Sequence, residues 1–149
     1  MRAADLMLGV KICQTENGIS LDQQHFIKAL LEQYGIKGCK AMVTPLTPNK
    51  HLTQATEEEL VTFRNLKENY RSAIGSINYL STATRPNLSF TVSALSQYLE
   101  QLGIKHWQAF MHVLRYLRGS SNRGLLYAAE KDSGINAYSE ADWGNCSMT

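Results

Sequence analysis

Residues 70–86 read YRSAIGSINYLSTATRP, and this stretch decides much of the fold. Tyr70, Ile74 and Ile77 recur at intervals of three and four residues, which is the spacing of one helix face, and Leu80 or Ser81 continues the row. The acidic run of residues 57–59 lies upstream, where the first turn of a helix favours negative charge. We therefore predict a helix from about residue 57 to residue 82, with an interruption near residue 69.

Two further helices are expected downstream. Arg85-Pro86 ends the first helix and opens a second, because proline disfavours helical geometry in the residue before it and fits a first turn. Gly103 is expected to end the second helix, and Gly119 to end a third over residues 105–118. The apolar row is Leu88, Val92, Leu95 and Leu99 in the second helix, and Trp107, Phe110, Met111, Leu114 and Leu117 in the third.

The sequence before residue 57 predicts a hairpin, a helix and a connector. Apolar residues alternate on either side of the turn residues 16–18, which is typical of a β-hairpin. Asp22 is expected to cap a helix from about residue 23 to residue 34, which Gly35 ends. Residues 38–56 lack periodicity and contain Pro45 and Pro48, so an extended connector is expected there. The apolar residues are Leu8, Val10, Ile12, Ile19 and Leu21 in the hairpin, and Phe26, Ile27, Leu30, Leu31 and Tyr34 in the helix.

Two short strands are predicted after the last helix, over residues 124–127 and 135–139, with a polar turn between them. The expected fold class is α+β and predominantly helical. It consists of an N-terminal β-hairpin, a helical bundle and incomplete C-terminal strands.

The composition describes a soluble globular protein. The chain has 149 residues, of which 44% are hydrophobic and 19% charged. Three widely separated cysteines, Cys13, Cys39 and Cys146, favour free thiols in a reducing compartment, so the cytoplasm or the nucleus is expected. No apolar run reaches the roughly 18 residues of a membrane span, so no membrane partner is expected.

Positive charge is concentrated in one part of the chain. The net charge is only +2, but no Asp or Glu occurs between residues 101 and 129. Lys105, His112 and Arg115 lie at helical spacing, with Arg118 and Arg123 nearby, and clustered cations of this kind hold phosphates. The five residues are candidate nucleic-acid contacts, and an ordinary solvated basic face fits the same pattern. Residues 106–107, His-Trp, fit either a stacking pair for bases or a helix start with a core tryptophan.

Several short motifs follow one another along the chain: LGVKI at residues 8–12, GISLDQ at 18–23, LLEQYG at 30–35 and TPL at 44–46. Together they resemble the Pol polyprotein of copia-type retrotransposons, in which LGVKI is similar to the family's LG(I/V)xI strand. The stretch 70–86, LSQY at 95–98, His106-Trp107 and LRYLRG at 114–119 resemble the thumb and connection. YSEADW at 138–143 resembles the family's YSDADW, which opens the ribonuclease H domain. The order and spacing, rather than any one motif, carry the resemblance.

The resemblance implies a division of the chain. Residues 1–37 correspond to the end of the reverse transcriptase palm, with Leu8 and Gly9 in the hairpin that grips the primer, and residues 38–56 to a connector. Residues 57–123 correspond to a helical thumb and connection, and residues 124–149 to a truncated start of ribonuclease H. The implied partners are an RNA:DNA hybrid or another nucleic acid and the remainder of the polyprotein.

The parent chemistry uses Mg²⁺ ions held by clustered carboxylates, and this chain carries no complete set. The polymerase motif with paired aspartates has no counterpart here. Glu140 falls on the position of the first ribonuclease H aspartate, and Asp142 is a second acid of this remnant; both equally fit ordinary exposed strand-end acids. We expect no complete catalytic or metal site, no cofactor and no enzyme activity in the isolated chain.

Three hypotheses follow. The chain is a non-catalytic fragment of a copia-type reverse transcriptase and ribonuclease H polyprotein, whose parent acts in RNA-templated DNA synthesis and transposition. Alternatively, it is a retained nucleic-acid- or protein-binding module derived from that polyprotein. In the third hypothesis, a partner chain completes the ribonuclease H site.

Overall fold

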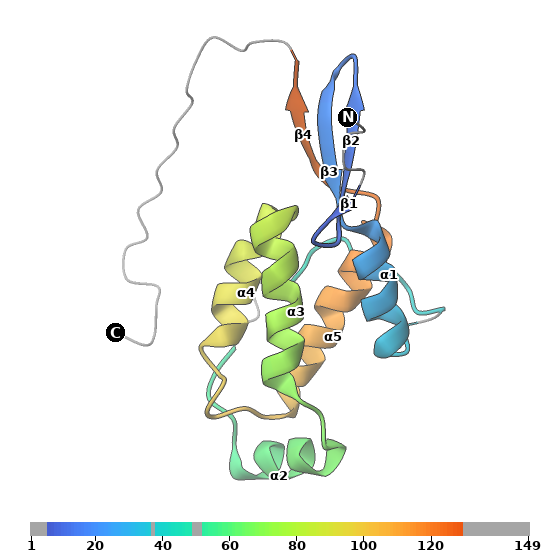
Figure 1. Ribbon diagram of the computed structural model, residues 1–149. Coiled ribbons are helices and arrows are strands. Elements are labelled where there is room, and N and C mark those ends of the chain that lie inside the picture. The colour runs from blue at the N-terminus through green and yellow to red at the C-terminus, as the bar shows by residue number, and fades with distance from the viewer. Residues whose placement is uncertain (1–5, 37, 49–51, 130–149) are drawn as a thin grey trace, which may run out of the picture.

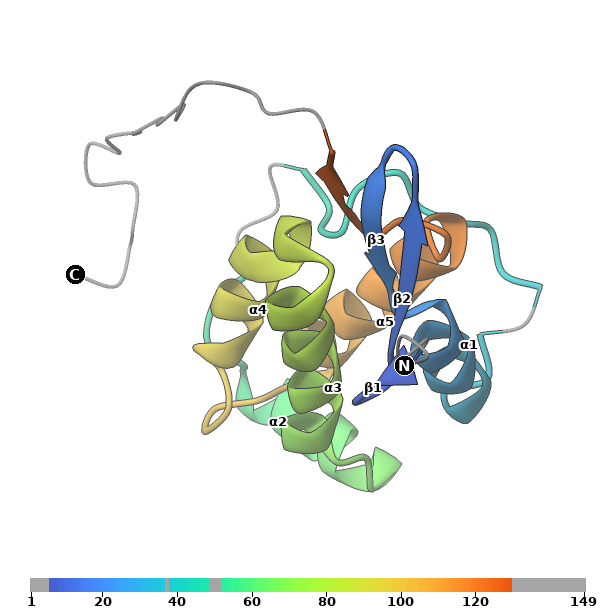
Figure 2. The same cartoon turned by 45° about the horizontal axis from the view of Figure 1, so that its top comes forward.

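The computed structural model describes residues 6–36, 38–48 and 52–129. A small antiparallel sheet stands beyond one end of a helical bundle (Figures 1 and 2). The elements are β1 (Leu6–Met7), β2 (Val10–Thr15), β3 (Gly18–Asp22), α1 (Gln24–Gln33), α2 (Glu57–Leu66), α3 (Tyr70–Ala83), the 3-10 turn η1 (Pro86–Leu88), α4 (Ser89–Ser96), α5 (Ile104–Gly119) and β4 (Leu125–Ala128). The predicted α+β, predominantly helical fold is confirmed.

The predicted helix over residues 57–82 consists of two helices. Thr56 begins α2 with a capping box, in which its hydroxyl accepts from the Glu59 amide and the Glu59 carboxylate accepts from the Thr56 amide. Lys67 ends α2 in the left-handed conformation, and the Asn69 side chain caps α3 by accepting from the Ser72 amide at 3.0 Å. The interruption expected near residue 69 is therefore present, and local capping groups explain it.

The helix that follows Pro86 is shorter than predicted. Proline begins η1, which continues into α4, but α4 ends at Ser96 rather than near Gly103. Gly103 instead immediately precedes α5, where its amide donates to Nδ1 of His106 at 3.0 Å. The assignment of Gly103 as the end of the second helix was wrong, because a glycine can flank either end of a helix.

The helices enclose one hydrophobic core. Its members are Ile27, Leu30, Leu31, Ile36, Phe63, Tyr70, Ala73, Ile74, Ile77, Leu80, Leu88, Val92, Leu95, Trp107, Phe110, Val113, Leu114, Tyr116 and Leu117. Leu99 and Met111, which the apolar rows include, are only partly buried against this core. Trp107 lies among Tyr34, Phe63 and Phe110, with ring centroids 5.2 to 5.9 Å apart.

The first helix follows the prediction closely. It runs over Gln24–Gln33, and Gly35 follows it with a φ of +66°. Asp22 does act at its start, since its Oδ1 accepts from the Gln24 amide at 3.1 Å. In residues 38–48 and 52–56 the chain has no helix or strand, as expected for a connector.

The sheet differs from the expected arrangement in two ways. Its order is β1-β2-β3-β4, all antiparallel, so β4 pairs with β3 of the N-terminal hairpin. The predicted second strand, residues 135–139, lies outside the described residues. Leu8 is not a strand residue: Leu8 (φ 49°) and Gly9 (φ 78°) form a turn between β1 and β2. The alternation of apolar residues groups Leu8 with the strand, because this pattern does not reveal that the chain reverses direction at Leu8 and Gly9.

Two glycines allow β3 and β4 to approach. A Cβ at Gly18, whose φ is +136°, would lie 2.0 Å from the Tyr127 carbonyl oxygen. A Cβ at Gly124 would lie 2.1 Å from the Leu21 carbonyl oxygen. Both positions therefore exclude a side chain. Among the described helices, none is long and apolar enough to cross a membrane.

Candidate nucleic-acid interface

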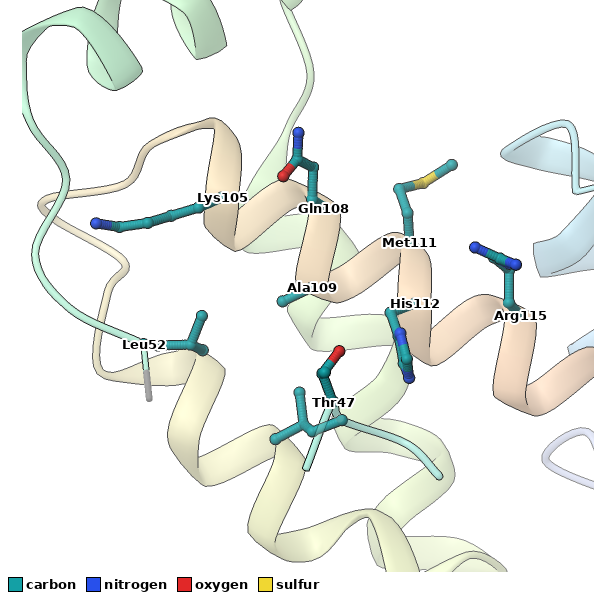
Figure 3. A pocket seen from close by; sticks show the side chains of 9 residues that line it. Thr47, Leu52, Lys105, Gln108, Ala109, Met111, His112 and Arg115 are labelled. Carbon is teal, nitrogen blue, oxygen red and sulfur yellow. The ribbon is translucent and has the colours of Figure 1, made fainter. Parts of the chain in front are cut away.

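Four of the five predicted contact residues lie on α5, and three of them, Lys105, His112 and Arg115, lie beside the connector. Figure 3 shows Lys105 at one end of the helix, with His112 and Arg115 two to three turns further on. Lys105 points away from the other two cations. The three cations share one side of α5 but do not converge on a single point.

Backbone carbonyls of the connector accept hydrogen bonds from all three of these residues. Arg115 donates through Nε to the Lys40 carbonyl at 3.0 Å, and its own carbonyl accepts from the Met42 amide at 3.3 Å. His112 donates through Nε2 to the Thr44 carbonyl at 3.0 Å. In the described part of the chain, the Arg115 guanidinium uses only Nε in this way, so its two Nη groups remain available to an anion.

The positive charge of Lys105 is balanced by the carboxylate of Glu59. Its Nζ lies 3.0 Å from Glu59 and donates to Oγ1 of Thr53 at 2.9 Å and to the Gln54 carbonyl at 2.7 Å. The pKa of Glu59 is lowered, first by the hydrogen bond from the Thr56 amide and then by Lys105. Lys105 thus joins the start of α5 to the start of α2 and to the end of the connector, and much of its charge is already neutralised.

The two residues of the His-Trp pair belong to the core. His106 is fully buried and stacks on Tyr98 at 4.3 Å. Its Nδ1 accepts from the Gly103 amide, so Nε2 carries the proton and donates to the Thr53 carbonyl at 3.0 Å. Burial lowers the pKa of His106. Trp107 is buried as well, so the interpretation as a helix start with a core tryptophan is confirmed and neither ring is exposed to stack on a base.

A cavity of about 370 Å³ separates α5 from the connector. Its described lining contains three cationic or titratable bases and no Asp or Glu. The lining residues are Leu46, Thr47 and Leu52 from the connector and Lys105, Gln108, Ala109, Met111, His112 and Arg115 from α5 (Figure 3). Such a lining favours an anion over a cation. Arg118 and Arg123 are exposed and do not line the cavity.

A second basic groove was not predicted from the sequence. Lys11 of β2 and His25 and Lys28 of α1 line a groove of about 600 Å³, together with Leu6, Gly9, Asp22, Gln23 and Gln24. Lys11 lies opposite Asp22 in the β2–β3 register, so the carboxylate partly offsets the positive charge of this groove. No local signal could have found this groove, because strand pairing and the position of α1 bring the residues together.

The primer-grip-like residues form the exposed turn beside this groove. Leu8 is 84% exposed, and its carbonyl accepts from the hydroxyl of Tyr79 on α3. A left-handed conformation at a leucine is costly, so the turn is held by its surroundings. Leu8 and Gly9 are therefore placed at the surface, on a fixed turn.

Sequence reasoning also missed the structural role of Arg85, which is 1% exposed. Its Nη1 and Nη2 donate to the carbonyl and the hydroxyl of Ser120 at 2.9 and 2.8 Å, and its Nε to Asn87 at 3.2 Å. The guanidinium lies 5.6 Å from the Tyr116 ring centroid. Within the described ranges no carboxylate pairs with it. Arg85 joins the end of α3 to the end of α5.

The ribonuclease H remnant, Glu140 and Asp142, lies outside the described residues. Across residues 6–36, 38–48 and 52–129, no group of three His, Cys, Asp or Glu side chains is placed to hold a metal ion.

Comparisons with known proteins identify relatives of the chain. The chain is 32% identical over 136 residues to the retrovirus-related Pol polyprotein from transposon RE1 of Arabidopsis thaliana, a match that covers 91% of this chain and 9% of that protein. It is 33% identical to the corresponding protein from transposon RE2 of the same plant, with the same coverage. The Pol polyprotein from transposon TNT 1-94 of Nicotiana tabacum is 34% identical over 145 residues, 93% of this chain and 11% of that protein.

The chain thus spans about a tenth of the length of these curated relatives. No protein-family model matches it, and no solved structure matches it significantly. All three relatives are retrovirus-related Pol polyproteins from transposons, and each match extends over almost the whole of this chain. The chain is therefore a homologue of one segment of the much longer retrovirus-related Pol polyproteins of copia-type transposons.

Proposed function

We propose that this chain is a non-catalytic segment that positions nucleic acid within a copia-type reverse transcriptase and ribonuclease H polyprotein. In this proposal it comprises the end of the reverse transcriptase, the thumb and connection, and the start of ribonuclease H. The parent acts in RNA-templated DNA synthesis, and an RNA:DNA hybrid is the partner. The supporting observation is the basic side of α5, where Lys105, His112 and Arg115 line a cavity with no carboxylate in its described lining, and where Arg118 and Arg123 are exposed nearby.

The candidate contact residues differ in how freely their side chains can bind a phosphate. Arg115 keeps both Nη groups for a phosphate. Arg118, in the last turn of α5, and Arg123, which follows the helix, are exposed. Lys105 is paired with Glu59, and His112 donates to the Thr44 carbonyl of the connector. Phosphate binding therefore rests on the three arginines, while Lys105 and His112 hold the connector in place.

Salt dependence of binding tests this assignment. Three cations that meet duplex phosphates give a slope of log K against log salt near about −2.7. We expect this slope for an RNA:DNA hybrid, measured by fluorescence anisotropy with the full chain. Arg115→Gln and Arg118→Gln should each make the slope shallower by about 0.9. Lys105→Gln should change it less.

The matched control is Arg71→Gln on α3, which removes an exposed arginine away from the cavity. This variant should leave the slope unchanged. A slope indistinguishable from zero for the parent chain, or the same loss in the Arg71 variant, would contradict the proposed interface.

A separate cleavage assay with an RNA:DNA hybrid tests whether the chain is non-catalytic. The purified chain is expected to leave the RNA strand of a hybrid intact in the presence of Mg²⁺. Cleavage without a partner chain that disappears in a Glu140→Gln variant would contradict the non-catalytic assignment. Cleavage that appears only when a second polypeptide supplies further carboxylates would favour the hypothesis of a completed ribonuclease H site.

One observation favours the alternative, a retained binding module. The helices close a core of their own, which includes Phe110 and Leu114 with no exposed surface. A chain with such a core has the means to fold and bind alone. Hybrid binding by this chain alone, as tight as that of a longer polyprotein containing it, would favour the module. Much weaker binding by this chain would favour the positioning segment.

A further inference from the structure

The sheet has one largely apolar face and one mixed face, on which Leu6 and Leu126 lie beside the charged Lys11 and Asp22. In an antiparallel pair, directly opposed residues point to the same side. The register places Met7 opposite Val10, Ile12 opposite Leu21 and Leu125, and Gln14 opposite Ile19 and Tyr127. We call these eight residues the apolar sheet face. Seven of them are apolar and none is charged.

This face contributes nothing to the described core. None of its residues belongs to the core or to the partly buried residues that pack on it. Met7 is 58% exposed, Ile19 41% and Tyr127 59%, and the other four apolar residues of the face, Val10, Ile12, Leu21 and Leu125, are only half-buried. β-Strands with one apolar face normally bury it. A contiguous exposed apolar patch marks a surface that another group covers.

We propose that the apolar sheet face is a docking surface for the segment of this same chain that follows β4. The argument begins with the exit point. The Ala129 amide donates to the Asn17 carbonyl at 2.9 Å, so the chain leaves the sheet at the turn between β2 and β3, next to Tyr127 on the face itself.

The segment has sufficient length to cross the face. From that turn to the row of Met7 and Val10 the distance is about 20 Å, since β2 has six residues. Residues 130–134 are polar or glycine and suit a reversal. The nine residues from Ile135 to Trp143 then reach about 30 Å when extended, which exceeds the length of the face.

The residue types of the segment fit an apolar surface. Ile135, Tyr138 and Trp143 supply one aliphatic and two aromatic side chains. A tether of this length gives an effective concentration in the millimolar range, so a modest contact suffices.

A second copy of the chain fits the face less well. Four strands and the length of β2 give a footprint of roughly 14 Å by 20 Å. Stable interfaces cover roughly 800 Å² on each partner, which is more than this face offers. A single crossing segment matches its size. This inference is independent of the proposed nucleic-acid interface.

Thiol protection on β4 tests the proposal. Tyr127 and Leu126 are neighbours with similar exposure, 59% and 64%, but they point to opposite faces. In a full-length background with Cys13→Ser, Cys39→Ser and Cys146→Ser, the thiol of a Tyr127→Cys variant should be alkylated about tenfold more slowly than that of a Leu126→Cys variant. The alkylation rate of each thiol in the folded protein is divided by its rate in denaturant, which removes differences in intrinsic reactivity between the two thiols. Circular dichroism verifies that each variant is folded. An Ile19→Cys variant, on the same face as Tyr127, replaces the Tyr127→Cys variant if that one does not fold.

The origin of the protection identifies the occupant. Adding Ile135→Ser and Trp143→Ser should raise the Tyr127→Cys rate to that of Leu126→Cys, while adding Lys131→Ser should not. The protection should also survive dilution, because an intramolecular contact does not depend on concentration. Equal rates for the two thiols, protection that persists in the Ile135 and Trp143 variant, or protection lost on dilution would each overturn the proposal. The last result would assign the face to a second copy.

Discussion

The helical bundle and the sheet are stabilised in different ways. In the bundle, apolar rows of α1, α3, α4 and α5 meet, and residues such as Phe110 and Leu114 lose all contact with solvent. In the sheet, backbone pairing is regular over β2, β3 and β4, but Ile19 and Tyr127 remain largely exposed. Burial supplies most of the free energy of folding, whereas a hydrogen bond that replaces one to water contributes little. Substitutions in the bundle should therefore cost much more than equivalent ones in the sheet.

The largest effect is expected at Phe110. Phe110→Ala removes a ring with no exposed surface and leaves a cavity in the hydrophobic core beside α5. The free energy of unfolding should therefore fall by about 3–5 kcal/mol. Phe90→Ala is the matched control, because Phe90 on α4 is 78% exposed and should change stability by no more than about 0.5 kcal/mol. Urea denaturation measures both. Similar losses in the two variants would show that the described core is not the stabilising one.

Arg85 should have the next largest effect. Arg85→Lys keeps the charge but cannot donate at once to the carbonyl and the hydroxyl of Ser120, which are both buried contacts of the guanidinium. The expected loss in free energy of unfolding is about 2 kcal/mol, from buried polar groups left without partners. The exposed Arg71 offers the comparison: Arg71→Lys should be neutral. A neutral Arg85→Lys variant would mean that the link between α3 and α5 contributes nothing.

His106 should make the bundle sensitive to acid. Its pKa is lowered by burial, so the unfolded state binds the proton more readily than the folded state. Its contribution to stability is complete above the ordinary histidine pKa of about 6.5 and declines as pH falls from there toward the folded pKa. Lys105 and Glu59 also face this ring, and they act in opposite directions.

The measurement is the free energy of unfolding as a function of pH. His106→Gln should flatten its slope below about pH 6.5. The loss in the parent is roughly 1.4 kcal/mol for each unit by which the pKa is lowered. An unchanged slope in the His106 variant would contradict the neutral, buried assignment.

The smallest effect on global stability is expected in the sheet. Gly124→Ala places a Cβ 2.1 Å from the Leu21 carbonyl oxygen, so β4 should separate from β3. Hydrogen exchange should show lost protection in β3 and β4, while α5 stays protected and global stability changes by no more than about 0.5 kcal/mol. Gly75→Ala, where nothing lies within 4 Å, should instead stabilise α3 by up to about 1 kcal/mol. Loss of α5 protection in the Gly124 variant would show that the sheet and the bundle unfold together.

The candidate site illustrates what could be predicted and what could not. Helical spacing placed Lys105, His112 and Arg115 on one side of a helix, and the structure has them there. That the connector accepts hydrogen bonds from all three was not predictable, because residues 40–54 are distant in sequence and carry no periodic pattern. The buried environment of His106 and the second basic groove at Lys11 and Lys28 likewise depend on contacts between distant segments.

The helices, their apolar faces, the N-terminal hairpin and the family resemblance can be read along the chain, since they follow from periodicity, capping groups and motif order. Three features arise only on folding: β4 joins the N-terminal sheet, the connector lies on the basic side of α5, and Arg85 is enclosed beside Ser120. The two sets differ in the range of the interactions that produce them. Periodicity and capping depend on neighbours within a few residues, whereas pairing, docking and burial depend on which distant segments meet.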